Sequence, residues 1–128
     1  MKLSPLVLVI FGFSIALKEN RAIGQTWIEV GSSDKAAYFV DTTSIRNPQR
    51  GLKDNVRFNT VIELTTPTDK GIKSVGLLID YDCGVNLSYV VSTSVYRGSM
   101  GTNKVDSSTG GGLNFSINQR TRELICRN

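Results

Sequence analysis

Apolar and polar residues alternate with a period of two along much of the chain, as they do in half-buried β-strands. Short strands are expected at Trp27–Val30 and Ala37–Asp41, on either side of a turn at residues 31–34. A loop over residues 47–51, marked by Asn, Pro and Gly, follows the second strand. The first part of the pattern therefore predicts antiparallel β-structure.

Three longer stretches show the clearest alternation, and each predicts a strand with one apolar face. Their apolar positions are Val56, Phe58, Ile62 and Leu64, then Val75, Leu77, Ile79, Tyr81 and Cys83, and finally Leu87, Tyr89, Val91 and Val95. Because successive strand residues point to opposite sides, Cys83 is expected to face the same side as the apolar residues of its strand.

The end of the chain has a different pattern. Residues 98–112 contain five glycines and few apolar side chains, so a mobile loop or a short ragged strand is expected there. Apolar positions then recur at helical spacing, at Ile117, Thr121, Leu124 and Ile125. Ser116 or Asn118 is suited to cap the start of that helix. The whole pattern predicts an α+β, mostly β fold, in which an antiparallel sheet is followed by one C-terminal helix.

Cys83 and Cys126 are the only cysteines of the chain. An even number of cysteines in a short exported domain indicates a disulfide, and two unrelated buried thiols are the alternative. The bond would close a loop of about 44 residues and join the predicted helix to the apolar side of the Cys83 strand. A three-turn helix is marginal by itself, so this bond would help to hold the helix against the sheet.

The first residues have the features of an export signal. A basic residue precedes the apolar run Leu3–Leu17, which is too short to span a bilayer comfortably. Cleavage after Gly24 fits the small-residue rule, cleavage after Ala16 is the second option, and an uncleaved membrane tether is the alternative. Residues 1–24 are therefore predicted to be a signal peptide. Residues 25–128 are predicted to be a single domain with no stable membrane span, exported to the periplasm, the cell surface or the medium.

Composition excludes several classes of function. Without the leader, the chain has twelve Lys and Arg residues and ten Asp and Glu residues, and no basic nucleic-acid-binding motif. The chain has no histidine, which removes the usual hydrolase triads, histidine zinc sites and the commonest general acid or base. No phosphate-binding glycine motif is present either. We therefore expect no catalytic residue, no metal, no cofactor and no nucleic acid partner.

Two groups of charged residues remain as candidate sites. Asp80 and Asp82 share one strand face, as in a glycosidase or cation-binding pair, but a solvated strand face explains them better. Arg46, Arg50 and Lys53 cluster in one loop and are the candidate contacts for an acidic partner, such as a sulfated glycan or an acidic protein surface. An ordinary solvated loop is the alternative for this cluster.

Five short segments follow one another in a recognisable order: TWIEV, YFVDTTSIR, LIDYDC, LSYVVSTSVY and LIC. Their order and spacing, over Thr26–Cys126, resemble the bacterial surface-adhesin protein E-like family. The resemblance implies a curved antiparallel sheet with a C-terminal helix tethered by the Cys83–Cys126 disulfide. It also implies that the protein mediates adhesion by binding host extracellular matrix or serum proteins.

These observations favour a secreted or cell-envelope binding protein without enzymatic activity. The alternative is a periplasmic small-ligand binder or inhibitor that uses the sheet face where the helix does not cover it. A hydrolase that depends on Asp80 and Asp82 is the third and least favoured hypothesis. The pattern predicts neither the identity of the ligand nor the oligomeric state.

Overall fold

The structure is a computed structural model that describes residues 25–48, 54–109 and 116–126. The predicted signal peptide, residues 1–24, lies outside the described residues. The described elements are, in chain order, β1 (Trp27–Ser32), β2 (Ala36–Asp41), a 3-10 helix (Thr42–Ser44), β3 (Asn55–Leu64), β4 (Ser74–Asp82), β5 (Leu87–Tyr96), β6 (Lys104–Thr109) and α2 (Gln119–Ile125). The predicted mostly β fold with one C-terminal helix is confirmed.

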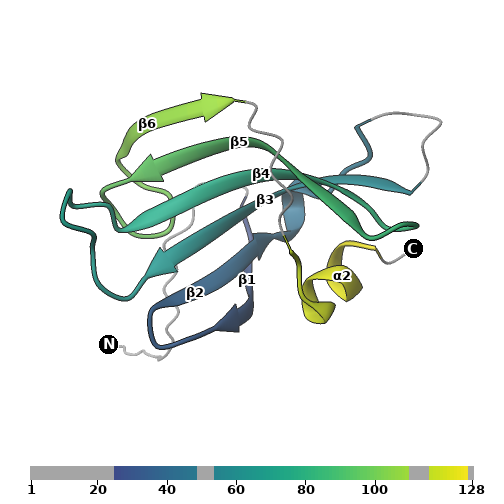
Figure 1. Ribbon diagram of the computed structural model, residues 1–128, viewed down its shortest axis with the longest axis horizontal. Helices are drawn as coiled ribbons and strands as arrows, with labels where there is room; N and C mark the ends of the chain where they lie inside the picture. Colours follow the sequence, from purple (N-terminus) through teal and green to yellow (C-terminus); the bar gives the residue numbers. More distant parts are fainter. Residues whose placement is uncertain (1–24, 49–53, 110–115, 127–128) are drawn as a thin grey trace, which may run out of the picture.

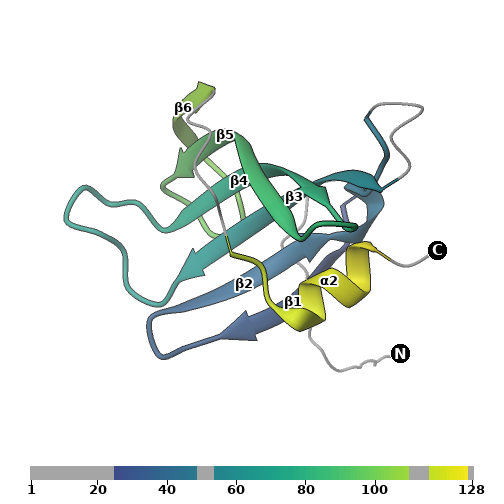
Figure 2. The ribbon, with the colours of Figure 1, turned by 45° about the vertical axis from the view of Figure 1, so that its right-hand side comes forward.

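The strands form one open sheet in the order β1-β2-β3-β4-β5-β6, and every neighbouring pair is antiparallel. Each strand therefore pairs with the next one in the sequence, and no crossover connection is needed. Figure 1 shows the sheet as a twisted, curved layer, and Figure 2 shows α2 lying across one face of it, beside β1. We name the side that carries α2 the helix face and the other side the open face.

The core lies between the helix face and α2. Phe58, Ile79 and Tyr81 are almost completely buried on that face, and Ile125 of the helix belongs to the same buried cluster. Cross-strand pairing puts Phe58 opposite Ile79 and Val56 opposite Tyr81, so the period-two pattern of β3 and β4 is confirmed. The alternate residues of both strands, which are mostly polar, therefore lie on the open face.

β5 departs from the predicted pattern because it contains a β-bulge. Ile79 pairs with Val90, but Leu78 pairs with Ser92. Val91 is thus an extra residue on β5 that has no partner on β4. The alternation of inward and outward side chains shifts by one residue at this point.

The bulge makes one prediction wrong: Leu87 and Tyr89 do not lie on the apolar side with Val95. Ser88 and Val90 point into the core instead, and each is only 8% exposed. Leu87 and Tyr89 are 59% and 46% exposed, on the open face. Two adjacent valines at the bulge both fit an apolar position, so the sequence pattern does not show where the alternation shifts.

β6 forms within the stretch for which a loop or a short ragged strand is expected. Its six residues are all exposed, and it pairs with β5 at the edge of the sheet. Residues 110–112 of that stretch lie outside the described residues. The helix begins at Gln119, with Asn118 as its N-cap, and Cys126 is its C-cap.

Candidate functional site

The Cys83–Cys126 disulfide is formed, as predicted. Cys83 lies directly after β4 and Cys126 at the end of α2, with their Cα atoms 5.9 Å apart. Both cysteines of the chain are used in this bond, so neither is a thiol that serves as a nucleophile or a metal ligand. The bond fixes the C-terminal end of the helix on the sheet.

The other end of α2 is fixed by its cap. Asn118 Oδ1 accepts hydrogen bonds from the backbone N–H (2.8 Å) and the hydroxyl (2.7 Å) of Thr121, and Asn118 Nδ2 donates to the Val30 carbonyl (3.0 Å). Arg120 Nε donates to the Glu29 carbonyl (3.2 Å). Val30 and Glu29 belong to the edge strand β1, so these bonds hold the helix and also cover part of an exposed strand edge.

Of the predicted basic cluster, the structure describes only Arg46. Its side chain is exposed, and its backbone pairs with that of Arg57 through two hydrogen bonds of 3.0 and 2.7 Å. Arg50 and Lys53 lie outside the described residues. The structure adds Arg57, on β3, as a cationic neighbour of Arg46.

Asp80, one of the two predicted acidic candidates, forms an ion pair with Arg57 across β3 and β4. Arg57 Nε and Nη2 donate to the two carboxylate oxygens at 2.6 and 2.8 Å. This hydrogen bonding to Asp80 raises the pKa of Arg57, against a smaller opposing effect of burial. The two side chains are 29% and 27% exposed, so the pair has a fixed geometry but stays accessible from solvent.

Asp82, the second acidic candidate, has a structural role at the β4–β5 turn. Its Oδ1 accepts hydrogen bonds from the backbone N–H groups of Gly84 (2.8 Å) and Val85 (3.3 Å). Asp80 and Asp82 share the open face, as expected, but each carboxylate already has a partner. This arrangement favours a strand face with structural ion pairing over an acid–base or cation-binding pair.

Four side chains form a row across the sheet on the open face. Arg46 lies opposite Arg57, Arg57 opposite Asp80, and Asp80 opposite Tyr89. Leu87 lies two residues before Tyr89 on the same face, at the β4–β5 turn end of the sheet. We name these five residues, Arg46, Arg57, Asp80, Leu87 and Tyr89, the tip surface.

The tip surface combines exposed apolar groups with a preorganised cation. Leu87 and Tyr89 are among the exposed large apolar side chains, and Val85 in the adjacent turn is 63% exposed. Sequence reasoning missed this group because it placed Leu87 and Tyr89 in the core and treated Arg57 as one polar residue of an alternating strand. Only the strand register shows that these side chains meet.

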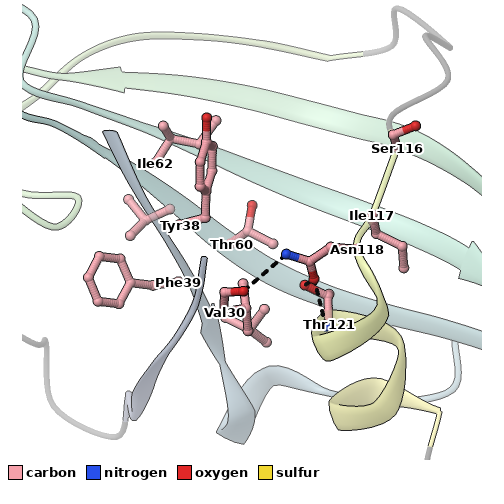
Figure 3. A pocket seen from close by; sticks show the side chains of 11 residues that line it. Val30, Tyr38, Phe39, Thr60, Ile62, Ser116, Ile117, Asn118 and Thr121 are labelled. Atoms are coloured by element: carbon pink, nitrogen blue, oxygen red, sulfur yellow. Dashed lines mark hydrogen bonds between the residues drawn. The ribbon is translucent and has the colours of Figure 1, made fainter. Parts of the chain in front are cut away.

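The helix face carries a separate cavity of about 270 Å³, which we name the helix-side cavity. Figure 3 shows Tyr38 and Ile62 on the sheet side of this cavity, and Ile117 and Asn118 on the segment that leads into α2. The part of the lining that the structure describes is mostly apolar and contains no charged side chain. The cavity lies where α2 leaves the sheet uncovered, which is the place that the small-ligand hypothesis requires.

The match to a known family covers most of the chain. The family model described as surface-adhesin protein E matches residues 27–127. The chain belongs to the surface-adhesin protein E family. The six strands, α2 and the disulfide of the described residues all lie within the matched range, so the resemblance seen in short segments extends over the whole domain. No curated protein matches the chain.

Membership of the surface-adhesin protein E family implies a binding protein that is exported or displayed at the cell surface. Among residues 25–48, 54–109 and 116–126 of this family member, no helix has the length and apolar character needed to cross a membrane. Within the same ranges, no three His, Cys, Asp or Glu side chains gather in a way that could hold a metal ion.

Proposed function

We propose that this member of the surface-adhesin protein E family is a secreted or cell-surface binding protein without enzymatic activity. It attaches to host extracellular matrix or serum proteins through the tip surface. Residues 1–24 direct its export and are then removed. The tip surface is the observation that carries the proposal, and membership of the family supports it.

The tip surface has the composition of a protein-binding hot spot. Tyrosine and arginine are enriched among the residues that dominate binding free energy, and Tyr89 and Arg57 lie in one row. Leu87 and Tyr89 are exposed, so burial of each against a partner contributes on the order of 1 kcal/mol. A few such side chains are enough to anchor an interface.

Arg57 offers a partner a guanidinium group in a fixed orientation. Asp80 holds the guanidinium group in one orientation, so little side-chain entropy is lost when a partner carboxylate approaches. Arg46 beside it, together with the predicted contacts Arg50 and Lys53, extends the positive charge. The proposed partner is therefore a protein surface with an apolar depression that acidic side chains border.

A double substitution tests the tip surface. Leu87→Ser with Tyr89→Ser should lower the affinity of the purified domain for a matrix or serum protein by about tenfold or more, since about 1.4 kcal/mol corresponds to a factor of ten. Surface plasmon resonance against a panel of purified matrix and serum proteins measures this affinity. Val105→Ser, which changes another exposed apolar side chain, on β6, is the matched control.

Two outcomes of this measurement would contradict the proposal. Unchanged affinity in the double variant would remove the tip surface as the binding site. Absence of binding to every protein of the panel would argue against an adhesive function altogether.

The basic cluster is tested separately. Replacing Arg46, Arg50 and Lys53 by Ala should weaken binding and reduce its dependence on salt, because salt screens contacts between exposed charges. The affinity is measured at low and high salt for the wild type and the variant. An unchanged affinity and salt dependence would assign the cluster to an ordinary solvated loop.

The helix-side cavity supports a second candidate function, that of a periplasmic small-ligand binder or inhibitor. The described residues of its lining are mostly apolar and none is charged, which suits a small, largely apolar molecule. Nile red, an uncharged fluorescent probe, should then bind the wild type and lose affinity for Ile62→Phe, which narrows the cavity. Nile red binding combined with failure of the whole protein panel would favour this candidate over adhesion.

A further inference from the structure

The open face carries a groove that is distinct from the tip surface and from the helix-side cavity. Trp27 lines it from the β1 side, Tyr96 and Met100 line it from the β5 side, and β3, β4 and β5 form its floor. We name it the Trp27 groove. Its volume is about 150 Å³, whereas pockets for drug-sized ligands have roughly 300–1,000 Å³. The groove therefore has room for one small ring.

The Met100 side of the groove is held in place by hydrogen bonds to the sheet. The fully buried Ser74 donates from its hydroxyl to the Gly98 carbonyl (2.7 Å) and accepts from the Gly101 N–H (3.0 Å). The Met100 N–H donates to Glu63 Oε1 (2.7 Å). Met100 has a φ of 53°, a left-handed conformation that costs a non-glycine residue roughly 1–2 kcal/mol. Strained backbone that its surroundings hold in this way is typical of a preorganised site.

The Tyr96 side of the groove depends on a glycine in the floor. A Cβ atom on residue 76 would lie 3.1 Å from Tyr96 Cε2 and 3.2 Å from its hydroxyl oxygen. A side chain at Gly76 would therefore push the tyrosine ring away from the sheet. The absence of that side chain lets Tyr96 lie close to the floor and border the groove.

The floor offers hydrogen-bonding side chains that have no side-chain hydrogen bond within the described part of the fold. Asn59, Ser92 and Ser94 line the groove and are partly exposed, and their side chains make no hydrogen bond to another described residue. Among the residues that the structure describes, no side chain that lines the groove carries a charge. The groove thus presents the aromatic side chains of Trp27 and Tyr96 together with the Asn59 amide and the hydroxyl groups of Ser92 and Ser94.

We propose that the Trp27 groove binds a neutral saccharide, with one sugar ring packed beside Trp27. The face of a sugar ring carries C–H groups that pack on the electron-rich face of an indole, while its hydroxyl groups exchange hydrogen bonds with amide and hydroxyl side chains. The described side chains of the lining are uncharged, so none of them forms an ion pair with a phosphate, sulfate or carboxylate group. This site does not depend on protein binding at the tip surface.

Trp27 is the only tryptophan of the chain, so its fluorescence reports on the groove. The purified domain is titrated with maltotriose, cellotriose and chitotriose, three neutral oligosaccharides with different ring substituents. At least one of them should change the emission in a saturable way. For that sugar, Ser92→Ala with Ser94→Ala should lower the affinity by about tenfold, since two hydrogen bonds are lost. Leu87→Ser with Tyr89→Ser, at the tip surface, should leave it unchanged.

Substitutions of Trp27 separate a binding role from a structural one. Among the described residues, Trp27 Nε1 has no hydrogen-bond partner, so Trp27→Phe should keep the thermal stability of the wild type. Saturation-transfer NMR should show weakened sugar binding for Trp27→Phe and none for Trp27→Ala. A lack of saturable binding with all three sugars, or wild-type affinity in the Ser92→Ala and Ser94→Ala variant, would overturn the proposal.

Discussion

Arg57 lies between Arg46 and Asp80 in the row of side chains that forms the tip surface. Its pKa decides whether this surface makes folding depend on pH. Its two hydrogen bonds to Asp80 raise its pKa and fix its orientation. A raised pKa on a base adds stability that is present at every pH below the pKa of free arginine, and that stability is lost only in strongly alkaline solution. Arg57 therefore contributes no pH dependence to folding in the neutral range.

Asp80→Asn removes the charge of the pair and nearly keeps its shape. The two side chains are 29% and 27% exposed, so solvent screens the pair and the free energy of unfolding should fall by about 1 kcal/mol or less. High salt should shrink the difference between variant and wild type. Urea unfolding at low and high salt measures both effects, and a loss of several kcal/mol that salt does not change would contradict this account of the pair.

At the scale of elements, β3, β4 and α2 follow the apolar periodicity, while the shift in β5 does not show in it. Val90 and Val91 are both apolar, and only pairing with β4 decides which of them enters the core. The tip surface was unpredictable for that reason, since Leu87 and Tyr89 reach the open face through this shift. The disulfide was predictable, because a cysteine pair in an exported domain needs no knowledge of the register.

The N-cap of α2, Asn118, is expected to anchor the helix to the sheet. Asn118→Ala should lower the free energy of unfolding by about 1–2 kcal/mol, because the helix loses its N-cap and the Val30 carbonyl loses a donor. Gln119→Ala, at the next and exposed position, should change it by less than about 0.5 kcal/mol. Chemical denaturation compares the two variants, and equal stabilities would show that Asn118 does not anchor the helix.

The Cys83–Cys126 disulfide is expected to stabilise the fold and to hold α2 in place. Cys126→Ser should lower the free energy of unfolding by about 2–4 kcal/mol, since the bond joins residues 43 positions apart and so constrains the unfolded chain. The amides of α2 should then exchange with solvent faster than those of β3 and β4. Hydrogen exchange and denaturation measure these effects. Two alkylatable thiols in the native exported protein would disprove the bond itself.

In the whole molecule, the two faces of the sheet carry different features. The core, α2 and the helix-side cavity lie on the helix face, where the disulfide joins α2 to the end of β4. The open face holds the tip surface and the Trp27 groove. Tip-surface substitutions are therefore expected to change binding with little effect on folding, because the main core lies on the other side of the sheet.

We propose that this domain meets its partners outside the cell. Protease treatment of intact cells tests it most directly, with the mature domain followed by immunoblot in the cells and in the medium. We expect the domain to be digested on intact cells, or to be found in the medium, while a cytoplasmic marker stays whole. Protection of the domain until the outer membrane is permeabilised would contradict it, because a protein confined to the periplasm does not reach a host surface.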